Sequence, residues 1–147
     1  MDETDIRILN VLRKAARTPF VDIARTAGVS DATVHLRVRG MLKSGVIERF
    51  SAIVNHEKLG YAFTAFVEIN VCPGALSKVI SAVAKMKSVL EVHELHGQCD
   101  LLVKVKARDL EGLRLLVTGI KSIHDVTASH SLPVLRVVKE HPDLDIE

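Results

Sequence analysis

The 147-residue chain has little of what several common kinds of site require. It contains no tryptophan, one tyrosine and two cysteines, and Cys72 and Cys99 form neither a CxxC pair nor a zinc-ligand spacing. Disulfides are not needed, because a chain of this length can bury a core without them. The cysteine usage favours a reducing, cytoplasmic compartment, and we expect no metal site.

Targeting segments and long apolar runs are also lacking. The first residues, MDETDIRILNVLRK, are acidic and helix-patterned, without the basic start and small-residue cleavage site of a signal peptide. No apolar run approaches the roughly 18 residues of a membrane span. We therefore expect a soluble intracellular protein.

Charge is distributed unevenly along the chain. Residues 1–50 carry nine Lys/Arg against six Asp/Glu, whereas residues 51–147 carry eleven against twelve. The basic surplus thus lies at the N-terminus. Such asymmetry is typical of a polyanion-binding module joined to a second part.

Hydrophobic periodicity predicts two helices in the first 28 residues. Thr18 and Pro19 match an N-cap followed by proline at the first helical position of the second helix, which ends at Gly28. The first helix has one apolar stripe at spacings of three and four, formed by Ile6, Leu9, Leu12 and Ala16.

A third helix is predicted directly after a short link. Ser30 is a good N-cap for it, and Gly45 ends it. The link of about four residues is too tight for antiparallel packing and indicates a helix-turn-helix. The buried stripe of this helix is expected to consist of Val34, Val38, Met41 and Leu42.

From Val46 onward the period changes from 3.6 to 2. Residues 46–55 are predicted to form a strand leading out of the helices, followed by a hinge to residue 61. The rest of the chain has the order βαββαβ, typical of the ferredoxin-like fold, in which two helices cover one face of a four-stranded antiparallel sheet. The uncovered face must meet water or another subunit. The predicted strands span 62–72, 89–96, 100–107 and 124 to about 138, and the predicted helices span 75–87 and 109–119.

The third helix carries residues suited to reading DNA. A helix enters the major groove with side chains of its N-terminal half at base edges, while basic groups and helix N-termini contact phosphates. The alternative is a plain three-helix bundle with solvated charges. The candidate residues are Thr18, Ser30, Asp31, Thr33, His35, Leu36, Arg37, Arg39 and Lys43, with Arg17, Arg25 and Arg49 as further phosphate contacts.

The stretch HELHGQCD, residues 93–100, suggests a metal site or a thiol nucleophile. Strand alternation, however, places His93 and His96 on opposite faces, and Cys99 has no recognisable base or anion-stabilising partner. The simplest interpretation is a hairpin loop over residues 97–99, with Gly97 supplying a positive φ.

Several patterns occur together along the chain. They are D-x-x-D-x-x-I-L-x-x-L from residue 2, I-A-x-x-x-G-V-S-x-x-T-V from residue 23, G-V-I from residue 45, N-x-x-x-L-G-Y from residue 55 and H-G-Q-C-D-L-L-V-K-V from residue 96. In this combination the chain resembles the Lrp/AsnC (feast/famine) transcription regulators over nearly its whole length. The resemblance implies an α+β protein with a three-helix winged helix-turn-helix domain and a ferredoxin-like RAM/ACT-like domain.

The resemblance also implies that different parts of the chain have different functions. Residues 1–50 would be the DNA-binding domain, 51–61 a strand and hinge linker, and 62–147 the effector-binding and oligomerisation domain. In such regulators the glycine and aspartate of the hairpin loop help form a pocket between dimers for a small effector, usually an amino acid. The alternative is a solvated turn with exposed strand hydroxyls. The pocket residues implied here are Gly97, Gln98, Cys99, Asp100, Thr127, Ser129 and Ser131.

We therefore expect a regulator without catalytic residues or cofactor. Its homodimers would read inverted repeats in double-stranded DNA and assemble into tetramers, octamers or larger rings. One rival is a sirohaem-decarboxylase-like enzyme on the same fold; those enzymes carry an aromatic-rich segment with a tryptophan where this chain has Leu101 and Leu102. The other rival is an effector or corepressor module that does not bind DNA.

Overall fold

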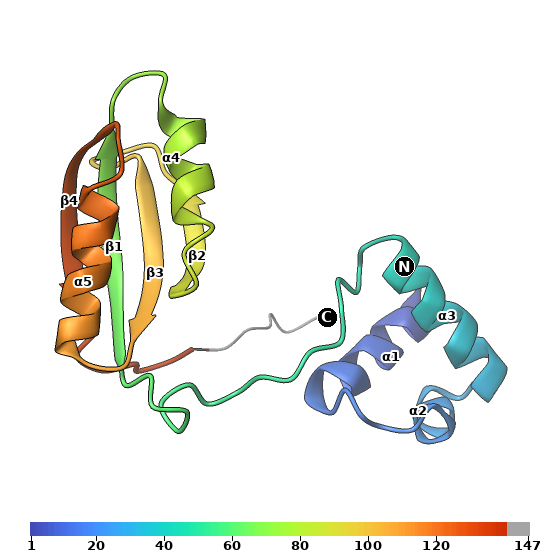
Figure 1. The fold of residues 1–147 in the computed structure, drawn as a ribbon. Coiled ribbons are helices and arrows are strands. Elements are labelled where there is room, and N and C mark those ends of the chain that lie inside the picture. The colour runs from blue at the N-terminus through green and yellow to red at the C-terminus, as the bar shows by residue number, and fades with distance from the viewer. Residues whose placement is uncertain (141–147) are drawn as a thin grey trace. The chain divides into compact units, whose positions relative to one another are not determined.

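The computed structural model describes residues 1–140, which belong to two compact units (Figure 1). One unit contains Met1–Ile53 and the other contains Val54–Val138. Residues 141–147 of the predicted effector-binding domain lie outside the described residues.

The first unit contains the three predicted helices, α1 (Glu3–Lys14), α2 (Phe20–Ala27) and α3 (Asp31–Lys43). Each contributes one apolar side to a shared core. The core consists of Ile8, Leu9 and Leu12 from α1, Ile23, Ala24 and Ala27 from α2, and Val34, Val38 and Met41 from α3.

The apolar stripe of α1 is shifted from the predicted one. Ile8 is completely buried, whereas Ile6 is partly exposed and Ala16 lies beyond the helix end. Ile8, Leu9 and Leu12 lie on the side of α1 that packs in one core with α2 and α3, and this packing sets which residues are buried. Asp2 and Asp5 form a capping box, in which each carboxylate accepts the other residue's backbone N–H at 3.0 Å, so α1 begins at Glu3.

Two further details of the helices differ from the prediction. Thr18 does not cap α2, because its hydroxyl donates to the Ala15 carbonyl at 2.8 Å and Pro19 occupies the N-cap. Leu42 is exposed rather than buried, since Val34, Val38 and Met41 already fill the side of α3 that faces α1 and α2.

The turn between α2 and α3 has the predicted form. Gly28 ends α2 in the left-handed conformation, with φ of 73°. Ser30 begins α3 by accepting the Thr33 backbone N–H at 3.1 Å. Only three residues, Gly28, Val29 and Ser30, therefore separate α2 from α3.

The strand predicted over residues 46–55 is absent, and with it the wing that this strand would form. An isolated extended segment has no neighbouring strand to pair its backbone N–H and C=O groups. Within the described residues no strand lies beside it. Its apolar side chains, among them Phe50, Ile53 and Val54, are exposed.

The second unit has the predicted βαββαβ order. The four strands form one antiparallel sheet in the order β2-β3-β1-β4, which confirms the ferredoxin-like arrangement. The elements are β1 (Phe63–Val71), α4 (Leu76–Val83), β2 (Val89–Glu94), β3 (Leu101–Ala107), α5 (Leu110–Lys121) and β4 (Val126–Pro133). The last strand is shorter than predicted and ends at Pro133.

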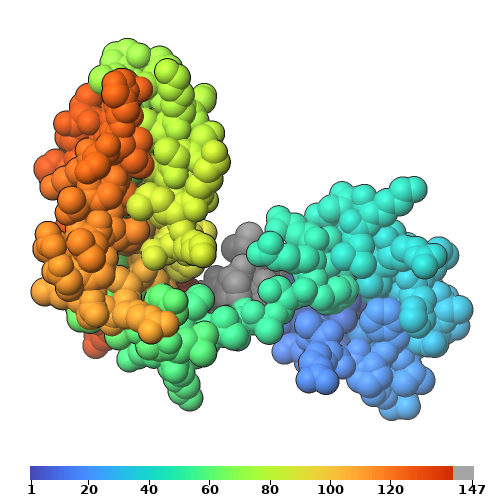
Figure 2. All heavy atoms as spheres, in the orientation of Figure 1, coloured from blue at the N-terminus to red at the C-terminus, as the bar shows by residue number. Residues whose placement is uncertain are grey.

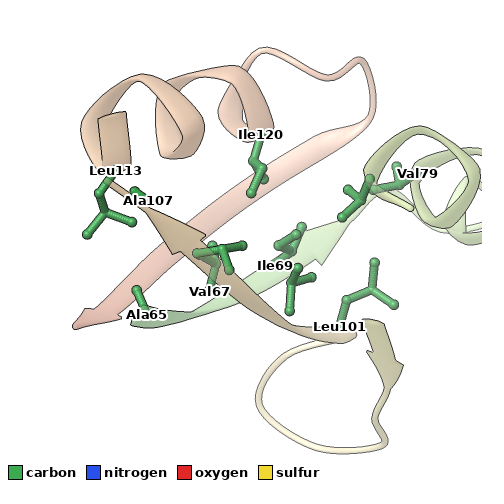
Figure 3. Packing of buried hydrophobic residues seen from close by; sticks show 11 residues of the cluster. Ala65, Val67, Ile69, Val79, Leu101, Ala107, Leu113 and Ile120 are labelled. Carbon is green, nitrogen blue, oxygen red and sulfur yellow. The ribbon is translucent and has the colours of Figure 1, made fainter. Parts of the chain in front are cut away.

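Both helices of this unit cover the same face of the sheet. Figure 2 shows the atoms of α4 (yellow-green) and α5 (orange) meeting over that face. Beneath them, alternate residues of the two central strands are buried, including Val67 and Ile69 on β1 and Leu101 on β3. Val79 of α4 and Ile120 of α5 point at these residues (Figure 3). No helix in the described chain is long and apolar enough to cross a membrane.

The shifted stripe of α1 is testable with a matched pair of variants. Ile8→Ala is expected to lower the free energy of unfolding by about 2–5 kcal/mol, because it leaves a cavity in a closed core. Ile6→Ala is expected to lower it by less than half as much, since Ile6 is already partly in water. Urea denaturation followed by circular dichroism measures both values. Equal losses for the two variants would contradict the burial pattern.

Candidate functional site

The outward face of α3 is set by the side that it buries. At about 100° per residue, the direction opposite the buried side falls on five residues, all of which are exposed. The predicted reading face of Asp31, His35 and Arg39 lies to one side of this direction. The five outward residues are Ala32, Leu36, Arg39, Gly40 and Lys43. Sequence analysis missed Ala32 and Gly40, although centring a helical wheel on Val34, Val38 and Met41 identifies them.

Arg37 is engaged within the helical unit. Its Nη1 atom lies 2.8 Å from Asp2 Oδ2 and 3.4 Å from Asp5 Oδ1, both at the start of α1. The hydrogen bond from the Asp5 backbone N–H, and then the charge of Arg37, hold the pKa of Asp2 below its usual value. The contact ties α3 to the first turn of α1.

His35 and the two hydroxyls at the start of α3 also have partners within the unit. The His35 ring packs edge-on against Phe20 with ring centroids 4.5 Å apart, and its Nε2 lies 3.8 Å from Asp31 Oδ2. The Ser30 and Thr33 hydroxyls are hydrogen-bonded to each other at 2.8 Å. By contrast, Arg39 and Lys43 form no ion pair with any residue between 1 and 140.

The loop between β2 and β3 is longer than predicted and is fastened to the end of β1. It is closed by the Leu95 N–H, which donates to the Asp100 carbonyl at 2.9 Å. Asp100 contacts β1 twice: its N–H donates to the Ile69 carbonyl at 3.0 Å, and its Oδ2 accepts the Val71 N–H at 2.8 Å. The Asn70 side chain donates to the Gln98 carbonyl at 3.1 Å. Asn70 was not predicted as a site residue.

Gly97 does not supply the positive φ that a short hairpin would require. Because the loop runs from Leu95 to Asp100, the chain reverses over more residues and no single one must adopt the left-handed conformation. Gly97 and Gln98 are exposed, so they are available at the surface of the loop.

Cys99 lies inside this loop with its side chain buried. Burial raises the pKa of the Cys99 thiol, and the charges of Glu68 and Asp100 raise it further. The thiol is therefore protonated at neutral pH and is a poor nucleophile.

The implied pocket residues of β4 lie across β1 from Asp100. Ser129 pairs with Ile69 and Ser131 with Val67, so their side chains share the helix-covered side of the sheet. Thr127 lies at the bulge between the Val126 and Ala128 pairs and is exposed. The strands that flank β1 are about 10 Å apart, twice the usual strand spacing. The Ser129 Oγ atom is buried and has no hydrogen-bond partner among the described residues.

The uncovered face of the sheet mixes apolar and charged side chains. Glu91 bridges two strands, with its carboxylate 3.0 Å from His93 Nε2 and 3.1 Å from Lys104 Nζ. The hydrogen bond with His93, followed by that from Lys104, lowers the pKa of Glu91. Glu68 and Phe66 are partly buried in the neighbouring strand. The structure brings together no group of three or more His, Cys, Asp or Glu side chains able to hold a metal ion between residues 1 and 140.

Comparison with known protein families identifies both units. The model of the AsnC-type helix-turn-helix domain matches residues 1–42, and the model of the Lrp/AsnC ligand binding domain matches residues 64–144. The HTH-type transcriptional regulator FL11 of Pyrococcus abyssi is 37% identical over 147 residues, covering 100% of this chain and 97% of that protein.

Solved structures agree with this assignment. E. coli AsnC superimposes with a TM-score of 0.91 at 26% sequence identity, covering 96% of both chains. A Neisseria meningitidis transcriptional regulator in complex with L-Met has a TM-score of 0.91 and covers 98% of this chain and 96% of its own; at 24% identity it shows the fold alone. The chain belongs to the Lrp/AsnC family of helix-turn-helix transcriptional regulators.

Proposed function

We propose that this regulator binds double-stranded DNA sequence-specifically, with α3 in the major groove. The observation that carries the proposal is the outward face of α3, on which Arg39 and Lys43 form no ion pair with any other residue of the described part of the chain. Two unpaired cations on the exposed side of a helix-turn-helix suit phosphates and guanine edges. Arg37 is assigned instead to holding α3 against α1, because both of its acidic partners belong to the start of that helix.

We further propose that the active species is a homodimer, joined through the uncovered face of the sheet, in the cytoplasm. Phe66, Leu102 and Leu132 offer apolar surface there beside charged neighbours, and no helix of the described chain covers them. A two-fold dimer would present two α3 helices to an inverted repeat with half-sites one helical turn or more apart. Further assembly into tetramers, octamers or rings is part of the same proposal.

The effector proposed for the second unit is a small molecule, namely a free amino acid. The Asp100 carboxylate is suited to an ammonium group, loop N–H groups to a carboxylate, and the Ser129 hydroxyl to a further hydrogen bond. Since Asp100 also holds Val71 and Ile69, occupation of this site would act directly on the end of β1. Because one structural neighbour was solved with L-Met, that amino acid belongs among the first to be tried.

The rival functions remain distinguishable by experiment. The curated relatives are named as transcriptional regulators, which favours a protein without enzymatic activity. A sirohaem titration without any shift of the Soret band would support this, and a saturable shift would favour the decarboxylase-like enzyme. A module that does not bind DNA would retain no duplex, and equal, weak, salt-sensitive retention of every duplex would contradict sequence-specific binding.

Replacing Arg39 and Arg37 by alanine, one at a time, separates DNA contact from helix packing. Arg39→Ala is expected to weaken binding to a selected duplex by about 1–3 kcal/mol, because a contact to a base edge or phosphate is lost. Its thermal stability should not change. Arg37→Ala is expected to lower the free energy of unfolding by about 1 kcal/mol, since Asp2 and Asp5 lose their cation. Gel-shift titrations and urea denaturation measure the two quantities, and the opposite pairing of effects would contradict these assignments.

Two variants of Asp100 separate its structural role from effector binding. Asp100→Asn keeps an oxygen for the Val71 N–H but removes the charge, so the fold should persist while amino-acid binding is lost. Asp100→Ala should also lower stability, by about 1–3 kcal/mol, because the N–H loses its acceptor. The measurement is the melting temperature with each of the standard amino acids, since a ligand raises it by mass action. An equal ligand-induced rise in the wild type and Asp100→Asn would refute the role of the charge.

A further inference from the structure

Leu36 is the most exposed large apolar side chain on α3. It is 71% exposed, although it lies in the middle of the helix and its neighbours Val34 and Val38 are buried in the core. A leucine at the centre of an outward helix face adds nothing to the packing of this unit. Its position on the surface proposed to meet DNA therefore suggests a contact with a partner.

The residues around Leu36 leave its side chain uncovered. One turn before it is Ala32 and one turn after it is Gly40, and residues four apart are neighbours on a helix surface. A Cβ built at Gly40 would meet no atom within 4 Å, so packing within the described chain does not require glycine there. Leu36 thus projects between two small residues, which allow another molecule to approach the helix backbone closely.

The charges near Leu36 indicate which kind of partner fits the ridge that Ala32, Leu36 and Gly40 form on the outward side of α3. Arg39 and Lys43 lie on the same outward side, one turn and two turns beyond Leu36. An apolar tip beside two cations matches a polyanion that also offers an apolar group. In the major groove of DNA that group is the C5 methyl of thymine, since the other groups that base pairs present there are hydrogen-bond donors and acceptors.

We propose that Leu36 is a specificity-determining residue that reads a thymine methyl in each half-site. The inference rests on the proposed binding of α3 in the major groove and adds the identity of one base. Removing the methyl should weaken binding roughly fourfold per contact, which is the about 0.8 kcal/mol of one buried methylene converted at about 1.4 kcal/mol per tenfold. Two half-sites in one dimer should give roughly fifteenfold.

The experiment begins with the full chain and a pool of random-sequence duplexes. Duplexes enriched by the wild type are resynthesised with deoxyuridine in place of each thymine in turn, which removes only the methyl group. Affinities are measured by gel shift for the wild type and for Leu36→Ala, a substitution that a helix accepts readily. Leu110→Ala, at a leucine 66% exposed on α5, is the matched control for losing exposed apolar surface.

The effects of deoxyuridine replacement and of Leu36→Ala on the binding free energy are expected to be non-additive. Deoxyuridine at one thymine per half-site should weaken the wild type and Leu110→Ala about fourfold per site. The same replacement should leave the affinity of Leu36→Ala unchanged, because the alanine side chain ends at Cβ and lacks the isobutyl tip that would contact the methyl. Circular dichroism should show Leu36→Ala folded like the wild type.

Three results would overturn the inference in different ways. If sequences are enriched but each deoxyuridine replacement lowers the affinity of the wild type and of Leu36→Ala by the same factor, Leu36 does not read thymine. The proposed DNA binding then stands. If Leu36→Ala instead changes only the oligomeric state in gel filtration, the ridge contacts another copy of the chain. If no sequence is enriched at all, the proposed function fails and the inference with it.

Discussion

The three-residue link between α2 and α3 is the constraint on which the DNA-facing surface depends. Gly28 ends one helix in the left-handed conformation and Ser30 begins the next, and α3 then turns Val34 and Val38 into the core. Arg37 of α3 also contacts Asp2 and Asp5, which form the capping box of α1, so a second contact holds α3 in place. Once the buried side is fixed, the outward side is fixed as well, and it carries Leu36, Arg39 and Lys43, two cations that form no ion pair within residues 1–140.

In the second unit, the loop between β2 and β3 is likewise held in place by specific contacts. Asp100 uses its backbone and its carboxylate to hold the end of β1, so the segment that carries the proposed effector contacts cannot move without disturbing the central strand. Burial raises the pKa of the Cys99 thiol in the same loop. A ligand at this loop would therefore act on the sheet whose opposite face is proposed to join two subunits.

Much of this architecture could be predicted from periodicity, because spacings of 3.6 and 2 report which residues share a face. The order βαββαβ, the cap at Ser30 and the stop at Gly28 follow from local chemistry. What failed were features set by contacts distant in sequence. The burial of Ile8 rather than Ile6 and the exposure of Leu42 depend on how three helices meet. The missing strand at 46–55 needs a partner strand, and the clasp of Asp100 on Val71 joins residues 29 positions apart. The effector and DNA contacts themselves remain predictions.

The most direct test of the central claim is a dimethyl sulfate footprint on a duplex enriched by the full chain. The reagent methylates guanine N7, which lies in the major groove. If α3 reads that groove, guanines should be protected in two clusters about 10 base pairs or a multiple apart, and Arg39→Ala should reduce the protection. Unchanged methylation at every guanine of a duplex that the protein demonstrably binds would contradict the account.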